Sequence, residues 1–225
     1  MIVDPGGDVQ DLLAALDFGV AAGNTPGAPL RVTSVVLTHA HLDHAGGVAE
    51  LLDALERRQG KRPELLGHRD DKELRGNVSR QALLFGLSPV EFRDCPEPDR
   101  YLEEGDTLTV GSTVGTALFT PGHAPGHISF FFAAGQHAIE LFDARRGRVL
   151  AHEAVTQPLL IAGDTLFAGS IGRTDLPGGS HETLLRSIEE KIFTLPEPTI
   201  VMPGHGEDTT VGKERCSNPF FAGCA

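Results

Sequence analysis

A short histidine-rich segment, placed directly after an apolar run, constrains this chain more than any other feature. Residues Val32–Thr38 are apolar and β-branched, which favours a buried strand. The sequence Thr-His-Ala-His-Leu-Asp-His then occupies Thr38–His44. Residues i and i+2 of an extended backbone point the same way, so we expect His39 and His41 to bind one ion at the end of this strand.

We expect the backbone to turn after this segment, and Gly46 and Gly47 permit a tight bend there. We expect Asp43 and His44 to leave the turn toward a second point near the first. Three more candidate ligands follow other apolar runs, each with a glycine just before it: His123, Asp164 and His205.

The ends of several strands meet at one edge of a sheet in α/β proteins, and ligands bind in the crevice that forms there. The seven side chains would then offer five imidazoles and two carboxylates, without a thiolate. Such a donor set suits zinc, iron or manganese. Seven ligands are too many for one tetrahedral ion and enough for two ions that share a carboxylate.

Elsewhere, short apolar strands alternate with amphipathic helices, which predicts one α/β domain over residues 1–225. The helices are expected over Val9–Leu16 (with Asp8 as N-cap and Gly19 as stop), Val48–Leu55, Asp70–Phe85 and Leu184–Ile192 (with Ser180 as N-cap). The further strands are expected over Thr107–Val110, Val114–Thr120 (turning at Gly111), Ile128–Ala133, Leu159–Ala162 and Thr199–Met202.

Composition excludes several classes of function. The formal charge is −12, from 19 Lys and Arg against 31 Asp and Glu, so the surface repels nucleic-acid phosphates. The longest apolar stretch, Ile128–Ala134, is far too short to span a membrane. No secretory signal is visible at the N-terminus. The number of cysteines is odd, which argues against a disulfide framework: Cys95, Cys216 and Cys224. Both observations favour the reducing cytoplasm.

The motif at Thr38–His44, followed by single ligands at later strand ends, resembles the metallo-β-lactamase superfamily. Gly163–Ser180 and Pro203–Phe220 are similar to the short bacterial type II glyoxalases, which are hydroxyacylglutathione hydrolases. The resemblance implies an αβ/βα sandwich with two divalent ions, zinc first and iron or manganese as alternatives. It assigns His39, His41 and His123 to one ion, Asp43, His44 and His205 to the other, and Asp164 with a hydroxide to the bridge between them.

Two departures from the family pattern are visible. The family begins with two further strands before the turn at Asp4–Gly7, whereas this chain starts with Met1-Ile2-Val3. We therefore expect a bare sheet edge and leave open whether a homo-oligomer covers it. Residues 136–158 resemble an insertion, and their alternation around Arg145–Gly147 predicts an extra hairpin.

The resemblance implies hydrolysis of a glutathione thioester, most simply S-lactoylglutathione, by the bridging hydroxide. Asp43 and Asp164 would be the catalytic carboxylates, and Asp43 would orient the hydroxide. An anionic substrate on an acidic protein needs local positive charge. By resemblance the candidates for binding it are Arg173, Lys213 and Arg215.

Several alternatives stay open. The first is a persulfide dioxygenase, which has the same fold, uses one iron and has relatives that resemble this chain at Gly172–Asp175. A β-lactamase or lactonase is a third enzyme class. The non-enzymatic alternative is a truncated, inactive metal-binding module. Two roles fit His127 equally well: it holds a neighbouring metal ligand in place by a hydrogen bond, or it is a buried structural histidine. The other histidines are assigned to structural roles because none ends a convincing strand: His68, His137, His152 and His181.

Overall fold

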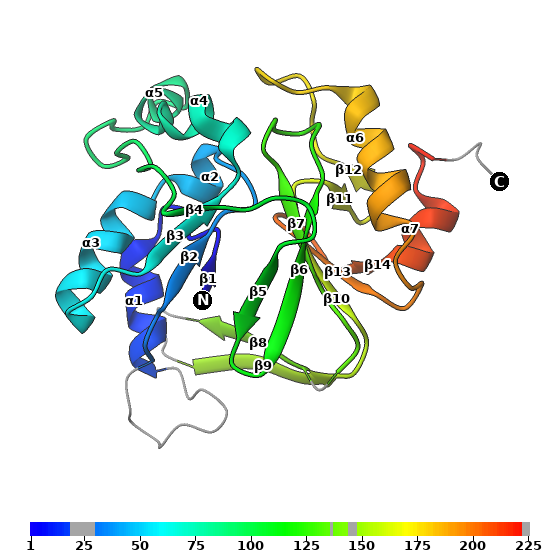
Figure 1. The fold of residues 1–225 in the computed structure, drawn as a ribbon, viewed down its shortest axis with the longest axis horizontal. Coiled ribbons are helices and arrows are strands. Elements are labelled where there is room, and N and C mark those ends of the chain that lie inside the picture. Colours follow the sequence, from blue (N-terminus) through cyan, green and yellow to red (C-terminus); the bar gives the residue numbers. More distant parts are fainter. Residues whose placement is uncertain (19–29, 136, 144–147, 222–225) are drawn as a thin grey trace.

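Two β-sheets face each other and helices cover their outer sides (Figure 1). The structure, a computed structural model, describes residues 1–18, 30–135, 137–143 and 148–221. The first sheet is parallel, with the order β1-β2-β3-β4: Ile2–Val3, Ser34–Val36, Glu64–Gly67 and Arg100–Tyr101. The second has the order β14-β13-β10-β7-β6-β5: Thr209–Thr210, Ile200–Pro203, Leu159–Gly163, Ile128–Phe132, Thr113–Phe119 and Thr107–Val110.

The helices lie in two outer layers. Those of the N-terminal half pack on the first sheet or cap its upper end: α1 Val9–Phe18, α2 Leu42–Ala45, α3 Val48–Gln59, α4 Lys72–Arg75 and α5 Val78–Leu84. Those of the C-terminal half cover the second sheet: α6 His181–Ser187, the π-helical turn η2 Ile188–Ile192 and α7 Val211–Ser217. The layers run helix, sheet, sheet, helix, which confirms the predicted αβ/βα sandwich.

Three apolar clusters fill the spaces between these layers. The cluster between the sheets includes Val36 and Leu66 from the first sheet and Ile128, Phe130 and Phe132 from the second. The other two lie between each sheet and its own helices. Strand β7 is covered on both faces. Ile128, Phe130 and Phe132 lie in the cluster between the sheets, and Phe131 packs, partly buried, against the cluster on the helix side.

Local sequence accounts for most elements. In α3, Val48, Leu51, Leu52 and Leu55 are buried, as their helical spacing predicts, and Gly60 ends the helix with a left-handed backbone. The predicted N-cap of α6 is confirmed, because the Ser180 hydroxyl accepts a hydrogen bond from Thr183 N–H. The predicted stop of α1 at Gly19 lies outside the described residues.

Two expected elements differ in the structure. The strand expected over Val32–Thr38 is only Ser34–Val36, because the side chain of Asp4 replaces a neighbouring strand as the partner of Thr38 N–H. The helix expected over Asp70–Phe85 is three pieces: a 3₁₀ turn, η1, at Arg69–Asp71, then α4 and α5. Gly76 and Asn77 separate α4 from α5.

The range predicted as an insertion contains an antiparallel pair, β8 His137–Asp143 and β9 Arg148–Val155. The predicted turn at Arg145–Gly147 lies outside the described residues. Strand β1 pairs with β2 alone and is the edge of the first sheet as described. A small sheet, β11 Leu166–Phe167 with β12 Ser170–Ile171, follows β10.

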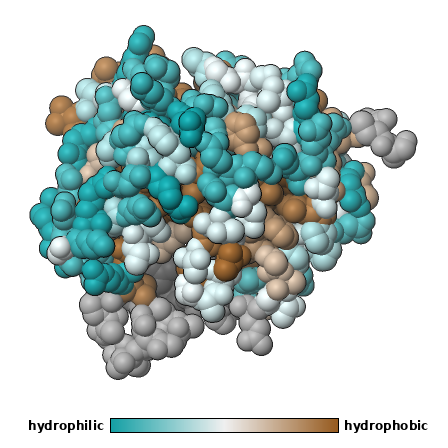
Figure 2. Space-filling view, viewed as in Figure 1, coloured by the Kyte–Doolittle hydropathy of each residue, from teal (hydrophilic) through white to brown (hydrophobic). Residues whose placement is uncertain are grey.

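One face of the molecule is mostly hydrophilic (Figure 2). Hydrophilic residues cover most of the face in Figure 2, and hydrophobic ones gather near its centre and at its upper left margin. Within the described residues, no helix is both long and apolar enough to cross a membrane.

Candidate metal centre

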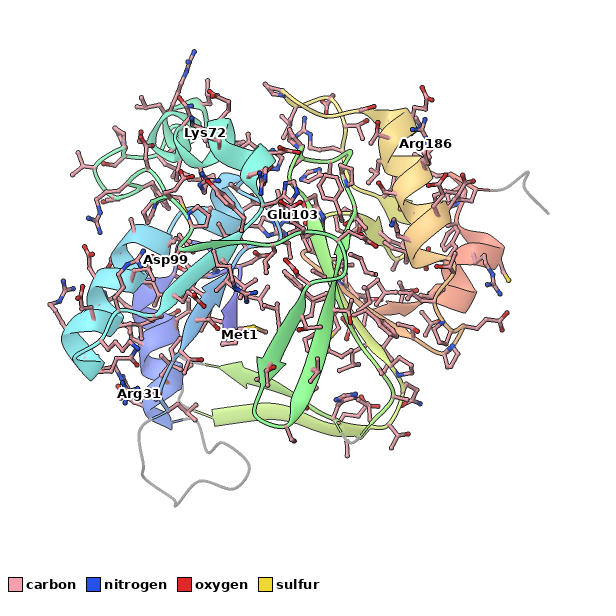
Figure 3. The ribbon with its side chains drawn as sticks, viewed as in Figure 1. Met1, Arg31, Lys72, Asp99, Glu103 and Arg186 are labelled. Atoms are coloured by element: carbon pink, nitrogen blue, oxygen red, sulfur yellow. The ribbon has the colours of Figure 1, made fainter. Side chains whose placement is uncertain are left out.

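Loops that follow four strands meet at one end of the sandwich. The segment after β2 carries His39 and His41 and continues into α2, which carries Asp43 and His44. The other three side chains come from the loops after β6, β10 and β13: His123, Asp164 and His205. These seven residues form two groups whose potential ligand atoms lie within 4.8 Å of one another in each group. In Figure 3 this end is the upper one, with Lys72 and Arg186 on its two sides.

The first group consists of three buried histidines whose nitrogens converge. His123 Nε2 lies 3.1 Å from His39 Nε2 and 2.9 Å from His41 Nδ1. Two tetrahedral zinc ligands at about 2.0–2.1 Å from the metal are roughly 3.3 Å apart, close to this spacing. Burial lowers the pKa of all three rings, that of His41 to about 4, so they are neutral and hold lone pairs for a cation.

The far nitrogens of two of these rings are fixed by hydrogen bonds. His123 Nδ1 donates to the backbone oxygen of Arg173 over 2.8 Å. His39 Nδ1 donates to the Thr38 hydroxyl over 3.0 Å, and that hydroxyl donates to Asp4. Each bond places the ring proton away from the group and leaves Nε2 as the ligand atom.

The second group combines two histidines with two carboxylates. His44 Nε2 lies 3.4 Å from Asp164 Oδ1, and His205 Nε2 lies 2.9 Å from Asp43 Oδ2. Asp164 is buried, whereas the side chains of Asp43 and His205 are both 55% exposed, so this group opens to solvent. The second oxygen of Asp164 lies 3.5 Å from His123 Nε2, which places this carboxylate between the two groups.

Asp4 supports both groups, and sequence analysis missed its role. Its carboxylate accepts hydrogen bonds from Thr38 N–H, the Thr38 hydroxyl and His44 Nδ1, at 2.7, 2.6 and 2.9 Å. Burial lowers the pKa of His44, but the carboxylates of Asp164 and Asp4 outweigh it and raise that pKa to about 10. The backbone of Asp4 is left-handed, with φ of 45°, a strained conformation typical of functional sites.

His127 is fully buried and contacts the backbone of Asp164, so it has features of both roles that the sequence left open. Its Nε2 accepts the Asp164 N–H over 3.0 Å, and therefore Nδ1 carries the proton and donates to Thr120. The Thr120 hydroxyl donates to Ser129, which donates to the oxygen of Ala162. Burial lowers the pKa of His127 well below its usual value, which keeps the ring neutral.

The residues fit a pair of divalent cations. Two buried atoms of the second group have no hydrogen-bond partner: His44 Nε2 and Asp164 Oδ1. Gly204 leaves room beside them, because an added Cβ would collide with Asp164 Oδ1 and lie 2.8 Å from His44 Cε1. Orphaned donors and acceptors of this kind are costly unless an ion or water satisfies them.

The predicted substrate-binding side chains lie at different places. Arg173 follows β12 and its guanidinium makes two 2.8 Å hydrogen bonds to Asp175, while its backbone contacts His123. Lys213 is exposed on α7. Arg215, also on α7, pairs with Glu197 and donates to the oxygen of Phe193. Arg173 is therefore the one joined directly to a residue of the first group.

The expectation that His68 follows no strand is wrong. His68 comes directly after β3, a strand too short and too ordinary in sequence to be recognised. Its ring is buried, stacks on Phe119 with centroids 4.4 Å apart, and caps η1 by accepting the Asp70 N–H. The ring is occupied with these contacts, in agreement with the predicted structural role.

A family model described as the metallo-beta-lactamase superfamily matches residues 1–139 and 153–205 and omits most of the β8–β9 hairpin. The hydroxyacylglutathione hydrolase GloC of Haemophilus influenzae is 34% identical over 98% of this chain and 86% of its own length. The probable metallo-hydrolase YqgX of Bacillus subtilis is 36% identical over 99% of this chain and 87% of its own.

Solved structures show the same fold. TTHA1623 in a di-iron-bound form has a TM-score of 0.69 and 33% identity, covering 97% of this chain and 87% of that one. The B3 metallo-beta-lactamase BLEG-1 has a TM-score of 0.69 and 32% identity, with coverages of 98% and 88%. ETHE1 from Myxococcus xanthus has a TM-score of 0.62 and 25% identity, with coverages of 98% and 73%.

Proposed function

Because the chain belongs to the metallo-β-lactamase superfamily, we propose that it is a binuclear metal-dependent hydrolase that cleaves a thioester, with S-lactoylglutathione as the expected substrate. The observation that carries this proposal is the pair of donor groups with Asp164 between them. The substrate class rests on the likeness to GloC. Zinc is the proposed metal, and iron is the alternative because TTHA1623 has a di-iron form.

The proposed roles follow from position. His39, His41 and His123 would hold one cation, Asp43, His44 and His205 the other, and Asp164 both. The cations would supply Lewis-acid chemistry, which activates water near neutral pH and polarises the carbonyl group under attack.

Asp43 is the carboxylate best placed to act on that water. Its side chain is half exposed on the open side of the second group, and the His205 ring holds one of its oxygens. We assign it to orient the attacking water and to accept its proton. A thiolate leaves without much help from an acid, so the reaction makes no demand for a further acidic group.

Arg173 is the proposed contact for the carboxylates of the glutathione moiety. Its backbone is tied to His123, and its side chain is exposed. The ion pair with Asp175 lies at the surface, where such a pair contributes little stability, so a substrate carboxylate can replace Asp175. Lys213 remains a candidate for the same role, whereas Arg215 already serves Glu197 and Phe193.

Turnover and metal content test the proposal together. Metal-loaded protein is expected to release thiol from S-lactoylglutathione and to contain two ions per chain by elemental analysis. Asp164→Ala should lose both the activity and the metal. Asp53→Ala is the matched control, because Asp53 is an exposed carboxylate of α3 that pairs with Arg93 and belongs to neither donor group. Both properties should survive in this control.

The same preparation separates the rival functions. The likeness to ETHE1 is compatible with a persulfide dioxygenase. One iron per chain, oxygen consumption with glutathione persulfide and an inert thioester would replace the hydrolase by that enzyme. Turnover of a β-lactam alone would instead favour a β-lactamase.

A further inference from the structure

A buried carboxylate outside both donor groups joins the two loops that carry the first group. Asp71 lies in η1 and is only 3% exposed. Its Oδ2 accepts the N–H of Ala40 over 2.8 Å, and its Oδ1 accepts the N–H of Gly126 over 2.6 Å. Both bonds have the short length of charge-assisted hydrogen bonds.

The two N–H groups that Asp71 accepts lie next to the histidines of the first group. Ala40 stands between His39 and His41, and Gly126 follows His123 by three residues. A backbone bond from Ile128 N–H to Thr38 oxygen joins the same two loops, but outside the stretches that hold the three histidines. Asp71 therefore ties the ligand-bearing stretches to each other.

Asp71 itself is held firmly. It follows β3 through His68, whose ring accepts the Asp70 N–H, and Arg75 from the next turn donates to the oxygen of His68. Gly126 packs closely, since an added Cβ there would lie 2.8 Å from the Asp71 carboxylate. A rigid element thus presents one carboxylate to both loops.

We infer that Asp71 is a positioning residue that sets the distance between the His39–His41 segment and His123, and with it the affinity of the first metal position. This inference rests on the metal-binding part of the proposed function and not on the substrate. Each carboxylate oxygen takes one N–H, so an isosteric amide cannot replace it. One of the two N–H groups would face an NH₂ and lose its acceptor.

Asp71→Asn tests the inference by titration of the metal-free protein with Zn²⁺ against a chelator. Nuclear magnetic resonance of the histidine rings reports which group each ion occupies. We expect the affinity of the first group to fall about 10–100-fold, the usual effect of removing a residue that orients a ligand. The affinity of the second group should fall by a smaller factor, because Asp71 bonds to none of its residues and the two groups share only Asp164.

Asp70→Asn is the matched control, since it makes the same charge change one residue away at a side chain that is 54% exposed. It should bind both ions as the wild type does. Equal affinities in Asp71→Asn and wild type, or equal losses at both groups, would overturn the inference. Absence of zinc binding by the wild type would instead overturn the proposed function.

A second measurement covers the case in which Asp71→Asn does not fold. Hydrogen exchange of the metal-free wild type should show Ala40 and Gly126 amides protected together with the core of β7. Fast exchange of either amide, with β7 still protected, would overturn the positioning role.

Discussion

Replacing His127 by leucine removes the buried support of Asp164 at nearly constant volume. The Asp164 N–H would lose its acceptor, and the Thr120 hydroxyl would lose the donor that now completes the chain to Ser129. A buried donor left unpaired costs about 1–3 kcal/mol, and the second loss adds less because Thr120 keeps its bond to Ser129. We therefore expect the metal-free protein to lose about 2–3 kcal/mol of unfolding free energy.

The same substitution should weaken metal binding, because the backbone at Asp164 is no longer held. We expect the affinity for the ion shared by Asp164 to fall at least about tenfold. Urea unfolding gives the stability, where a slope of about 2 kcal/mol/M converts the loss into a midpoint shift of roughly 1 M. Zinc titration against a chelator gives the affinity.

Ser129→Ala is the comparison that isolates the metal effect. It breaks the far end of the same chain, at the bond to the Ala162 oxygen, and should cost about 1 kcal/mol without a change in zinc affinity. If His127→Leu costs less than about 0.5 kcal/mol, or if both variants bind zinc equally well, the role assigned to His127 is refuted.

Three further outcomes are expected. Gly204→Ala should lower the zinc affinity and reduce the free energy of unfolding by about 1–3 kcal/mol, because the added Cβ would displace Asp164. Titration calorimetry measures the affinity, and scanning calorimetry measures the stability. The metal-free protein should lose stability below about pH 6.5, because burial lowers the pKa of His41 to about 4. Below that pH the ring gains a proton on unfolding, which lowers the free energy of unfolding by about 3 kcal/mol at pH 4. The unfolding temperature measured across this pH range checks this. Arg173→Ala should raise the KM for the thioester with little change in kcat, whereas Arg186→Ala, which breaks another exposed ion pair, should change neither.

The local sequence determined the elements with strong periodicity and clear end signals. The α3 helix, the β5–β6 hairpin at Gly111 and the Ser180 cap of α6 depend on residues only a few positions apart, so they were predicted from the chain alone. The histidine motif after β2 is local too, which is why its chemistry was visible. The broken helix over Asp70–Phe85 was missed because its weak periodicity gave no sign of the separation at Gly76 and Asn77.

Tertiary structure alone decided what surrounds the candidate ligands. Asp4 and Asp71 look ordinary in sequence, and each gains its role from partners that are remote in the chain or belong to the backbone. His127 was a candidate from the sequence, but its bond to the Asp164 N–H was not visible there. Hydrogen bonds to backbone N–H groups leave no signature in residue type, so no spacing rule could have found them. The sequence therefore determined which donor atoms this protein offers to metals, whereas the packing of two sheets decided where those atoms meet and what holds them there.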